Sequence, residues 1–389
     1  MSVIEEKNLH KKFIKVAKFL TRARSDADIS EEIVGILKIA IGKDNVDFMT
    51  VFEEKNSYTL EELKESLKSK GIELTEEEIL TKVKFLADNG VMMDQPNTSG
   101  VMVYRVLPYG RIFDYLFMRD IDAEDETIKE LARLQHNWHE KRRARVQENY
   151  EDYKSKIDKV IPIGRTIISS HTNQATGEEI QIEIDKAIEA PKEMILPTQT
   201  VQEIVEKYDD IAVGSCYCRN HARVLGNPCK QTNIKDTCFT FGKSARHTAK
   251  HGFARLISKE EALDLLEQIR DDGLVHRVMH LYANPKLRED AICNCCIDCC
   301  PLGGGSMVAP TANYTNYLSK IDPDMCVGCG ICIEKCHELI IELNDDGIAE
   351  RDEEKCIGCG VCAYFCPENA ISMVKTPLRI VRIMPPLRI

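Results

Sequence analysis

One cysteine pattern occurs twice near the end of the chain and restricts how this part can fold. The first copy reads Cys-x2-Cys-x2-Cys-x3-Cys over residues 326–336, and the second repeats that spacing over residues 356–366. A Cys-x2-Cys-x2-Cys loop wraps three thiolates around one face of an iron–sulphur cubane, and its glycines let backbone N–H groups approach the sulphides. Because the fourth cysteine of each run reaches the other cluster, the pattern predicts two [4Fe-4S] clusters.

The same rule divides the eight cysteines into two ligand sets. The first predicted set is Cys326, Cys329, Cys332 and Cys366. The second predicted set is Cys356, Cys359, Cys362 and Cys336. Two zinc knuckles are the alternative, which we disfavour because zinc sites usually pair their Cys-x2-4-Cys units across a longer gap.

With this doubled pattern, residues 320–375 closely resemble the bacterial two-cluster ferredoxins. The resemblance implies a ferredoxin-like fold, two [4Fe-4S] clusters and transfer of single electrons. The chain departs from the family at one position. Pro367 follows the second run as the family pattern has it, whereas His337 follows the first run. We therefore expect the environment of one cluster to differ from that in the family.

Composition narrows the class of protein further. The chain has 389 residues and a net charge of −11, which allows two to four domains and disfavours non-specific binding to nucleic acids or anionic membranes. No apolar run approaches 18 residues, so we expect no membrane insertion. The start of the chain lacks the pattern of a secretory signal. Seventeen cysteines, all within residues 216–366, indicate metal or redox chemistry in the reducing cytoplasm of an anaerobe.

The first third of the chain predicts a winged-helix-like domain. We expect helices over residues 8–24 and 30–42, a short strand at 57–59, helices over 60–67 and 75–89, and a hairpin of strands at 91–94 and 101–106. This order resembles a winged helix over residues 30–107. The second helix of the pair begins Thr75-Glu76-Glu77-Glu78, and these carboxylates would repel a polyanion. We therefore expect protein docking or scaffolding, and no nucleic acid.

A long helix, or two, is expected over residues 127–157. It carries His136, Trp138 and His139 ahead of a basic run at 141–145. The run is either a docking face for an acidic partner or a solvated face whose side chains cover apolar surface, and we favour the second. The two histidines could ligate a metal, but no thiolate or acidic pattern near them supports this.

Nine further cysteines lie upstream of the repeated pattern, in two groups. The first group is Cys216, Cys218, Cys229 and Cys238. The second group is Cys293, Cys295, Cys296, Cys299 and Cys300. The simplest division gives the first group one [4Fe-4S] cluster and four of the second group another. The alternatives are sites shared between the groups, an unusual cluster, or structural zinc, and adjacent cysteines require irregular loops because they point in different directions.

The surroundings of these cysteines add two expectations. A helix over 258–271, with Ser258 as its N-cap and Gly273 after its end, brings the two groups into one domain. Residues 216–255 are rich in Lys, Arg and His, which would offset the negative charge of clusters and thiolates, or alternatively bind an anionic substrate. No glycine-rich nucleotide motif is present, so we expect no nucleotide or flavin site in this chain.

These patterns together predict an α+β, multidomain protein. The expected parts are a winged-helix-like domain (1–120), a helical connector (121–160), a cysteine-rich α/β iron–sulphur domain (161–310), the two-cluster ferredoxin domain (311–375) and an apolar tail (376–389). The turn at 344–347 predicts a hairpin, and the acidic residues around it predict an anionic docking surface. The tail is expected to add an edge strand or to lie on a partner.

The leading functional hypothesis is an iron–sulphur electron-transfer protein within a larger anaerobic oxidoreductase complex. Its redox partner would contain flavin or metal, and homo- or hetero-oligomers are compatible with the sequence. One alternative is a reductase with a substrate-accessible upstream cluster, supported by the surplus cysteine, the basic run, His276 and His280. A second alternative is a redox-sensing winged-helix regulator. No residue is assigned a catalytic role, and an electron-transfer subunit is favoured over a stand-alone enzyme.

Overall fold

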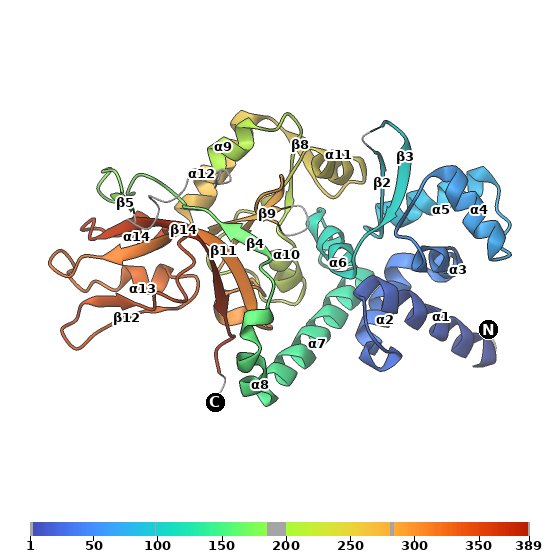
Figure 1. Cartoon of the computed structure of the whole chain (residues 1–389), viewed down its shortest axis with the longest axis horizontal. Helices are drawn as coiled ribbons and strands as arrows, with labels where there is room; N and C mark the ends of the chain where they lie inside the picture. The colour runs from blue at the N-terminus through green and yellow to red at the C-terminus, as the bar shows by residue number, and fades with distance from the viewer. Residues whose placement is uncertain (1–2, 98, 185–199, 281–283, 388–389) are drawn as a thin grey trace. The chain divides into compact units, whose positions relative to one another are not determined.

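The computed structural model describes residues 3–97, 99–184, 200–280 and 284–387, which form two compact units. Unit 1 comprises Met1–Lys141, Asn220–Pro228 and Arg246–Arg255. Unit 2 comprises Arg142–Arg219, Cys229–Ala245 and Leu256–Ile389. The mixture of helices and strands along the chain agrees with the predicted α+β class (Figure 1). Among the described helices, none is both long enough and apolar enough to cross a membrane.

Unit 1 is mainly helical, and its helices begin where the sequence offers caps. The helices that lie within it are α1 (Val3–Thr21), α2 (Glu31–Ile41), α3 (Val46–Met49), α4 (Leu60–Ser69), α5 (Glu76–Asp88) and α6 (Tyr109–Met118). The side chains of Ser30, Thr59 and Thr75 each accept a hydrogen bond from a backbone N–H in the first turn of the following helix. Helix α7 (Glu126–Glu148) begins in this unit.

A small antiparallel sheet follows the α4–α5 pair. Its strands are β1 (Ser57–Tyr58), β2 (Met92–Pro96) and β3 (Met102–Val106), in the order β1-β3-β2. Gly90 ends α5 with a left-handed φ of 69°, and a Cβ at this position would lie 2.9 Å from that of Tyr115. The residues expected to form a helix pair followed by a hairpin therefore do so, apart from the loop residue Thr98, which lies outside the described residues.

Unit 2 is built on one nine-stranded sheet, shown in Figure 1. Its strand order is β5-β14-β11-β4-β9-β10-β7-β6-β8. The strands in chain order are β4 (Gly164–Thr166), β5 (Ile182–Ile184), β6 (Ile211–Ser215), β7 (Asp236–Phe241), β8 (Arg255–Ile257), β9 (Val275–His280), β10 (Glu289–Cys295), β11 (Thr311–Ile321) and β14 (Ile371–Ile383). A separate hairpin pairs β12 (Ile341–Leu343) with β13 (Ala349–Arg351) around the expected turn.

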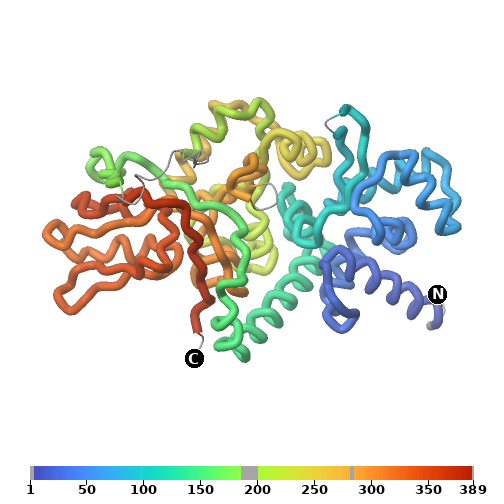
Figure 2. The backbone as a smooth tube through the Cα atoms, viewed as in Figure 1, coloured from blue at the N-terminus to red at the C-terminus, as the bar shows by residue number. Residues whose placement is uncertain are grey.

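The two longest strands carry the ferredoxin-like segment into this sheet. Strands β11 and β14 pair antiparallel from Ile321 with Ile371 to Thr311 with Ile383, as Figure 2 allows the reader to follow. Strand β4 adds to β11 in parallel at Asn313 and Tyr314. The residues expected to form a tail from 376 onwards thus continue β14 as far as Ile383 and pair with β11. Strand β14 lies between β5 and β11 and is not the edge of the sheet. The tail's last two residues lie outside the described range.

Helices and apolar clusters cover the sheet of unit 2. The remaining helices are α8 (Tyr150–Ser155), α9 (Val201–Glu206), α10 (Tyr217–Val224), α11 (Lys243–Lys250), α12 (Lys259–Asp271), α13 (Ile331–Lys335) and α14 (Val361–Tyr364). Of these, α10 from Asn220 and α11 from Arg246 onwards belong to unit 1. One apolar cluster includes Leu266 and Ile269 of α12 together with Phe239 of β7 and Val278 of β9. The predicted cap of α12 is present, since Ser258 Oγ accepts from the N–H of Glu261 at 3.1 Å. The expected helix start at Pro197 lies outside the described residues.

Candidate functional site

Two cavities in the ferredoxin-like segment are each lined by four cysteines. Helices α13 and α14 begin directly after Gly330 and Gly360, whose left-handed backbones turn each cysteine loop into its helix. One cavity, with an empty volume of about 370 Å³, is lined by Cys326, Cys329, Cys332 and Cys366. The other, with an empty volume of about 390 Å³, is lined by Cys336, Cys356, Cys359 and Cys362. These are the two ligand sets expected from the spacing.

The surroundings of these cysteines fit iron–sulphur clusters. The N–H of Ala349 donates to Cys326 Sγ at 3.5 Å, and the N–H of Ala370 donates to Cys366 Sγ at 3.3 Å. Burial raises the pKa of the Cys332 thiol to about 11. A free thiolate is therefore disfavoured at Cys332, whereas iron would stabilise the deprotonated sulphur. Backbone donors to sulphur and an apolar lining are what a [4Fe-4S] cluster requires.

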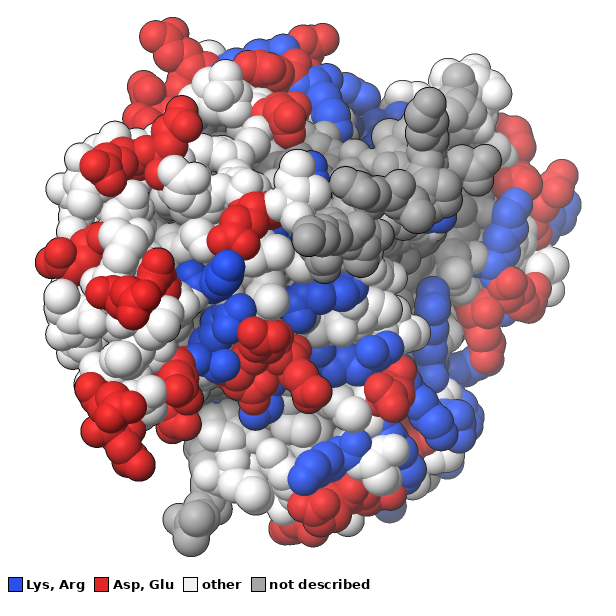
Figure 3. All heavy atoms as spheres, turned by 60° about the vertical axis from the view of Figure 1, so that its left-hand side comes forward, with Lys and Arg blue, Asp and Glu red and all other residues white. Residues whose placement is uncertain are grey.

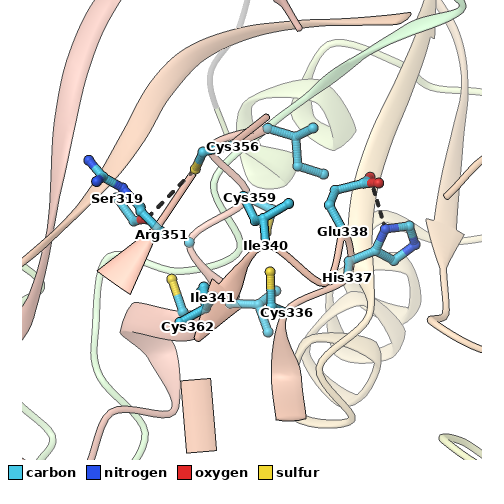
Figure 4. Close-up of a pocket in the computed structure, with 14 residues that line it drawn as sticks. Ser319, Cys336, His337, Glu338, Ile340, Ile341, Arg351, Cys356, Cys359 and Cys362 are labelled. Carbon is cyan, nitrogen blue, oxygen red and sulfur yellow. Dashed lines mark hydrogen bonds and ion pairs between the residues drawn. The ribbon is translucent and has the colours of Figure 1, made fainter. Parts of the chain in front are cut away.

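The second cavity is lined by cysteines that are all buried or half-buried. Figure 4 shows the side chains of Cys336, Cys356, Cys359 and Cys362 lining it, with Ser319 beside Cys356. Ser319 Oγ lies 3.6 Å from Cys356 Sγ, and this hydroxyl is buried. Gly358 lies so close to the backbone of Tyr317 that a Cβ would come within 2.1 Å of its carbonyl oxygen. The second loop is therefore held tightly against β11.

The first cavity lies nearer to solvent. Cys329 is the one exposed cysteine among the seventeen. Val327 and Met325 beside it are 64% and 47% exposed, and Leu339 is 53% exposed. Acidic side chains are exposed along the same segment, at Asp322, Asp324, Glu334, Asp345, Asp346, Glu353 and Glu354. Figure 3 shows a face that includes this part of unit 2, with acidic side chains prevailing over its left half.

Three neighbouring strands bring the upstream cysteines together at one end of the sheet. Cys216 directly follows β6, Cys238 lies near the start of β7, and Cys293 and Cys295 lie at the end of β10. Because β7 is antiparallel to both of its neighbours, these positions fall at the same edge. The thiol of Cys238 interacts with those of Cys216 and Cys293. Sequence reasoning gave sites shared between the two groups only as an alternative, because this convergence depends on strand pairing over long separations.

We call this the strand-end group, and it has six cysteines from both upstream groups. Its members are Cys216, Cys218, Cys238, Cys293, Cys295 and Cys300. Cys300 interacts with Cys218 and with Cys295, so the chain that leaves β10 turns back toward its own strand. Four of these six thiols suffice for one cubane, and the strand-end group therefore has the donor set for one further cluster.

The remaining three upstream cysteines form a second cluster of donors, here called the turn group. It consists of Cys229, Cys296, Asp298 and Cys299, whose ligand atoms lie within 4.8 Å of one another. Asp298 holds the two segments together, since it accepts from the N–H of Lys230 at 2.7 Å and lies 3.3 Å from Cys229 Sγ. Three thiolates and a carboxylate could hold zinc or iron.

This grouping departs from the simplest division of the upstream cysteines. That division kept Cys229 with Cys216, Cys218 and Cys238, whereas the structure places Cys229 beside Cys296 and Cys299. The alternative in which the two groups share sites describes the structure. The adjacent pairs explain why: Cys295 and Cys300 face the strand-end group, while their neighbours Cys296 and Cys299 face the turn group.

The residue that departs from the ferredoxin pattern connects the two cysteine-rich regions. His337 is buried and, with Cys295 and Cys300, forms a group of donors within 4.8 Å of one another. Its Nδ1 lies 3.0 Å from Glu338 Oε1, as Figure 4 shows. Burial alone would lower the pKa of His337, but Glu338 and Cys300 raise it to about 9. A proline here could make neither contact, so the departure has a structural consequence in the strand-end group.

Two buried arginines compensate negative charge around the upstream thiols. Arg277 Nη2 lies 3.3 Å from Glu338 Oε1, and both side chains are 2% exposed. Arg219 donates to the carbonyl of Asn294 at 3.3 Å and to Thr237 Oγ1. Burial opposes the charge of Arg219, but nearby thiols, first Cys216, raise its pKa overall. These contacts favour the role expected for cations near clusters over a role in binding an anionic substrate.

Other residues singled out in the sequence take structural positions. His276 Nδ1 lies 2.6 Å from Asn294 Oδ1, and His280 Nδ1 lies 2.9 Å from the carbonyl of Leu287. Both histidines are buried in β9, and burial lowers the pKa of His276 to about 4. His139 on α7 lies 3.0 Å from Gln135, and its ring contacts that of Trp138. These contacts are structural, and the substrate-accessible cluster for which His276 and His280 were the support stays a prediction.

The two four-cysteine cavities define a ferredoxin-type iron–sulphur segment. Residues 319–373 match the family model described as a 4Fe-4S dicluster domain. A curated relative, a probable ferredoxin from Methanosarcina thermophila, is 49% identical over 35 residues. That match covers 9% of this chain and 60% of the relative. No solved structure matches the chain. A ferredoxin-type domain implies electron transfer.

Proposed function

We propose that the chain relays single electrons between a partner docked near Cys329 and the buried cysteines of the strand-end group, as a component of a larger oxidoreductase complex. When bound, [4Fe-4S] clusters supply one-electron redox chemistry. The observation that carries the proposal is the position of His337. It directly follows Cys336 of the second cavity and contacts Cys300 of the strand-end group. Consecutive residues thus connect a ferredoxin site with the upstream donors.

Different residues of the chain serve partner docking and the stabilisation of sulphur along this route. The exposed apolar side chains of Val327 and Met325 suit contact with a partner, and the acidic residues around them favour a cationic surface. Backbone N–H groups donate to the sulphur atoms of Cys326 and Cys366, and Ser319 Oγ lies 3.6 Å from Cys356 Sγ. Deeper in unit 2, Arg277 and Arg219 offset negative charge. The partner we expect has a basic docking face and carries a flavin or a metal.

A redox titration of the full chain, purified without oxygen, tests the proposal. We expect dithionite-reduced protein to return about three or more electrons per chain on stepwise reoxidation, one for each cluster, without any substrate. The quadruple variant C238A/C293A/C295A/C300A, which leaves two of the six strand-end thiols, should return about two, because only the ferredoxin sites remain. If wild type also returns about two electrons, the upstream cysteines are not part of the relay.

The docking face can be tested with a small cationic electron donor, reduced methyl viologen. The exposed Asp324 precedes the first cysteine run and the exposed Glu334 lies within it, and D324K/E334K should slow reduction roughly several-fold at low salt. A matched reversal of two charges elsewhere, E77K with E61K in unit 1, should leave the rate unchanged. Equal slowing by both pairs would indicate an effect of net charge alone and would remove the docking face from the proposal.

A role for unit 1 in recognising another protein is the second part of the proposal. The order of α4, α5 and the β2–β3 hairpin, with β1 on the outer side of β3, supports a winged-helix-like domain. The exposed Glu76 and Glu77 at the start of α5 oppose a DNA phosphate backbone. A gel-shift assay at low salt tests the regulator alternative: we expect no retarded band, and a sequence-dependent one would establish DNA binding.

A further inference from the structure

A compact group of histidines and carboxylates lies in unit 1, which contains no cysteine. Asp88 is the last residue of α5, and Asp94 lies in strand β2. His247 lies in α11, and His251 directly follows the end of that helix. Asp94, His247 and His251 each offer one ligand atom, and these three atoms lie within 4.8 Å of one another. Two separate segments of one compact unit, β2 and residues 247–251, thus direct metal-ligating atoms to one point.

His251 is held as metal-binding histidines usually are. Its Nδ1 lies 2.7 Å from Asp88 Oδ1, and its Nε2 lies 2.7 Å from Asp94 Oδ1. A ligating histidine almost always has its other ring nitrogen bonded to a carboxylate or carbonyl, which fixes the tautomer and the orientation of the ring. Asp88 fills that role, and it leaves Nε2 to face Asp94 and the space next to it.

His247 provides an independent sign that something is bound here. Its side chain is 0% exposed, and neither ring nitrogen has a hydrogen-bond partner. Its Nδ1 lies 3.9 Å from Asp94 Oδ1, and its ring lies 4.7 Å from that of His251. A fully buried imidazole without a partner is rare in folded proteins.

We propose that Asp94, His247 and His251 bind one divalent transition-metal ion, with Asp88 as the positioning residue for His251. Two imidazoles and one carboxylate suit zinc or ferrous iron. Donor atoms around a tetrahedral ion with bonds of about 2.0–2.1 Å lie about 3.3 Å apart. The distances from Asp94 Oδ1, 2.7 Å and 3.9 Å, lie on either side of that value. The ion would replace the proton between His251 and Asp94.

Nearby lysines leave the required oxygen atoms free. Lys250 Nζ lies 2.6 Å from Asp94 Oδ2, which leaves Oδ1 directed at the histidines. Lys84 Nζ lies 2.5 Å from Asp88 Oδ2, while Oδ1 of the same carboxylate contacts His251. Each carboxylate therefore uses one oxygen for a lysine and the other for the site. The ion would fasten the segment that contains His247 and His251 to β2 and to the end of α5.

Zinc is the probe for the test. Its X-ray absorption edge separates it from cluster iron, and its ligand distances separate this site from cysteine sites. The full chain, purified without oxygen, is treated with EDTA, loaded with zinc and desalted. X-ray absorption should show nitrogen and oxygen ligands at about 2.0 Å, whereas zinc on thiolates shows sulphur at about 2.3 Å. We expect one zinc equivalent with imidazole ligands in wild type and none in H247F or D94N.

The variants are chosen to separate loss of metal from loss of structure. Phenylalanine suits position 247 because the ring packs beside Tyr115 and Phe253. The control is H221F, which replaces a half-buried histidine of unit 1 that contacts the carbonyl of Ala132, and it should retain the zinc. D88N should weaken zinc binding by about 10–100-fold. Wild-type zinc with sulphur ligands only, or an unchanged nitrogen and oxygen shell in both H247F and D94N, would overturn the proposal.

Discussion

The two cysteine-rich regions of unit 2 hold comparable numbers of thiols but assemble them in opposite ways. In the ferredoxin-like segment each loop supplies three cysteines from seven consecutive residues, and only the fourth comes from the other loop. The strand-end group instead gathers six cysteines from strands β6, β7 and β10 and from the turns beside them. A local loop encodes its ligand set in spacing, whereas a set built across a sheet depends on strand register.

The regions also differ in what surrounds the sulphur atoms. Apolar residues line much of both ferredoxin cavities, and Cys329 of the first is exposed, while His337, Glu338 and Arg351 also line the second. The strand-end group is accompanied by buried charges, namely Arg219, Arg277, Glu338 and His337. Because the charge next to a cluster helps to set its reduction potential, the two regions should differ in potential even with the same type of cluster.

The largest expected effect concerns the buried ion pair between these regions. In E338Q, Arg277 would keep its charge and lose its carboxylate partner in a site where both side chains are 2% exposed. Breaking a buried pair in this way costs about 3–5 kcal/mol. Chemical denaturation followed by circular dichroism should show the loss. The control E353Q, at an exposed glutamate, should unfold like wild type, and equal midpoints for all three proteins would show that the regions do not depend on this pair.

The next effect distinguishes two glycines of one turn. A Cβ on Gly303 would lie 2.2 Å from Cε1 of His337, whereas nothing lies within 4 Å of a Cβ on Gly305. G303A should therefore displace His337 and destabilise the protein by about 1–3 kcal/mol. G305A should be close to neutral. Iron content after desalting provides a second measurement, because displacement of His337 should release iron from the strand-end group first. Identical behaviour of the two variants would contradict this contact.

A smaller, pH-dependent effect is expected at the opposite end of β10 from its cysteines. Burial opposes the charge of Glu289, but Lys207 Nζ and Tyr208 Oη, each at 3.0 Å, help to hold the pKa of its carboxyl below the usual value. A lowered folded-state pKa adds stability that is present above about pH 4.5 and is lost as pH falls through the folded-state value. E289Q should lose about 1 kcal/mol at neutral pH.

The difference between wild type and E289Q should therefore shrink on acidification below about pH 4.5, which thermal melts at several pH values would measure. A conservative comparison is E203Q, since Glu203 caps a helix start near the same edge of the protein at an exposed position. A constant difference between E289Q and wild type down to pH 3 would show that the ionisation of Glu289 contributes nothing to stability.

The smallest effect is expected at the ferredoxin end of the sheet. Lys320 on β11 lies 3.0 Å from both carboxylate oxygens of Glu183, but the two side chains are 55% and 51% exposed. Exposed pairs of this kind contribute about 0–1 kcal/mol. K320A should therefore shift the denaturation midpoint far less than E338Q does. A comparable shift would mean that surface charge, and not burial, decides how firmly β11 is held.

Local signals predicted much of this molecule. Helices α2, α4, α5 and α12 begin within one residue of the expected positions, and the cysteine spacing predicted sets that line the two cavities. The long strand β11 was missed because buried positions occur on both of its faces, so it lacks the alternation of a half-buried strand. The group of histidines and carboxylates around His251 was also missed, since its two aspartates lie more than 150 residues before its histidines in sequence.

The interleaved sheet limits how independent the ferredoxin-like segment can be. Strand β11 pairs with β4, and β14 pairs with β5, so both outer edges of this hairpin are covered by strands from earlier in the chain. A fragment that began at Thr311 would leave those edges bare, and bare edges promote aggregation. Unlike a small ferredoxin, this segment cannot be exchanged between proteins as an independent domain. Its cysteine loops must change together with the sheet that carries the upstream thiols.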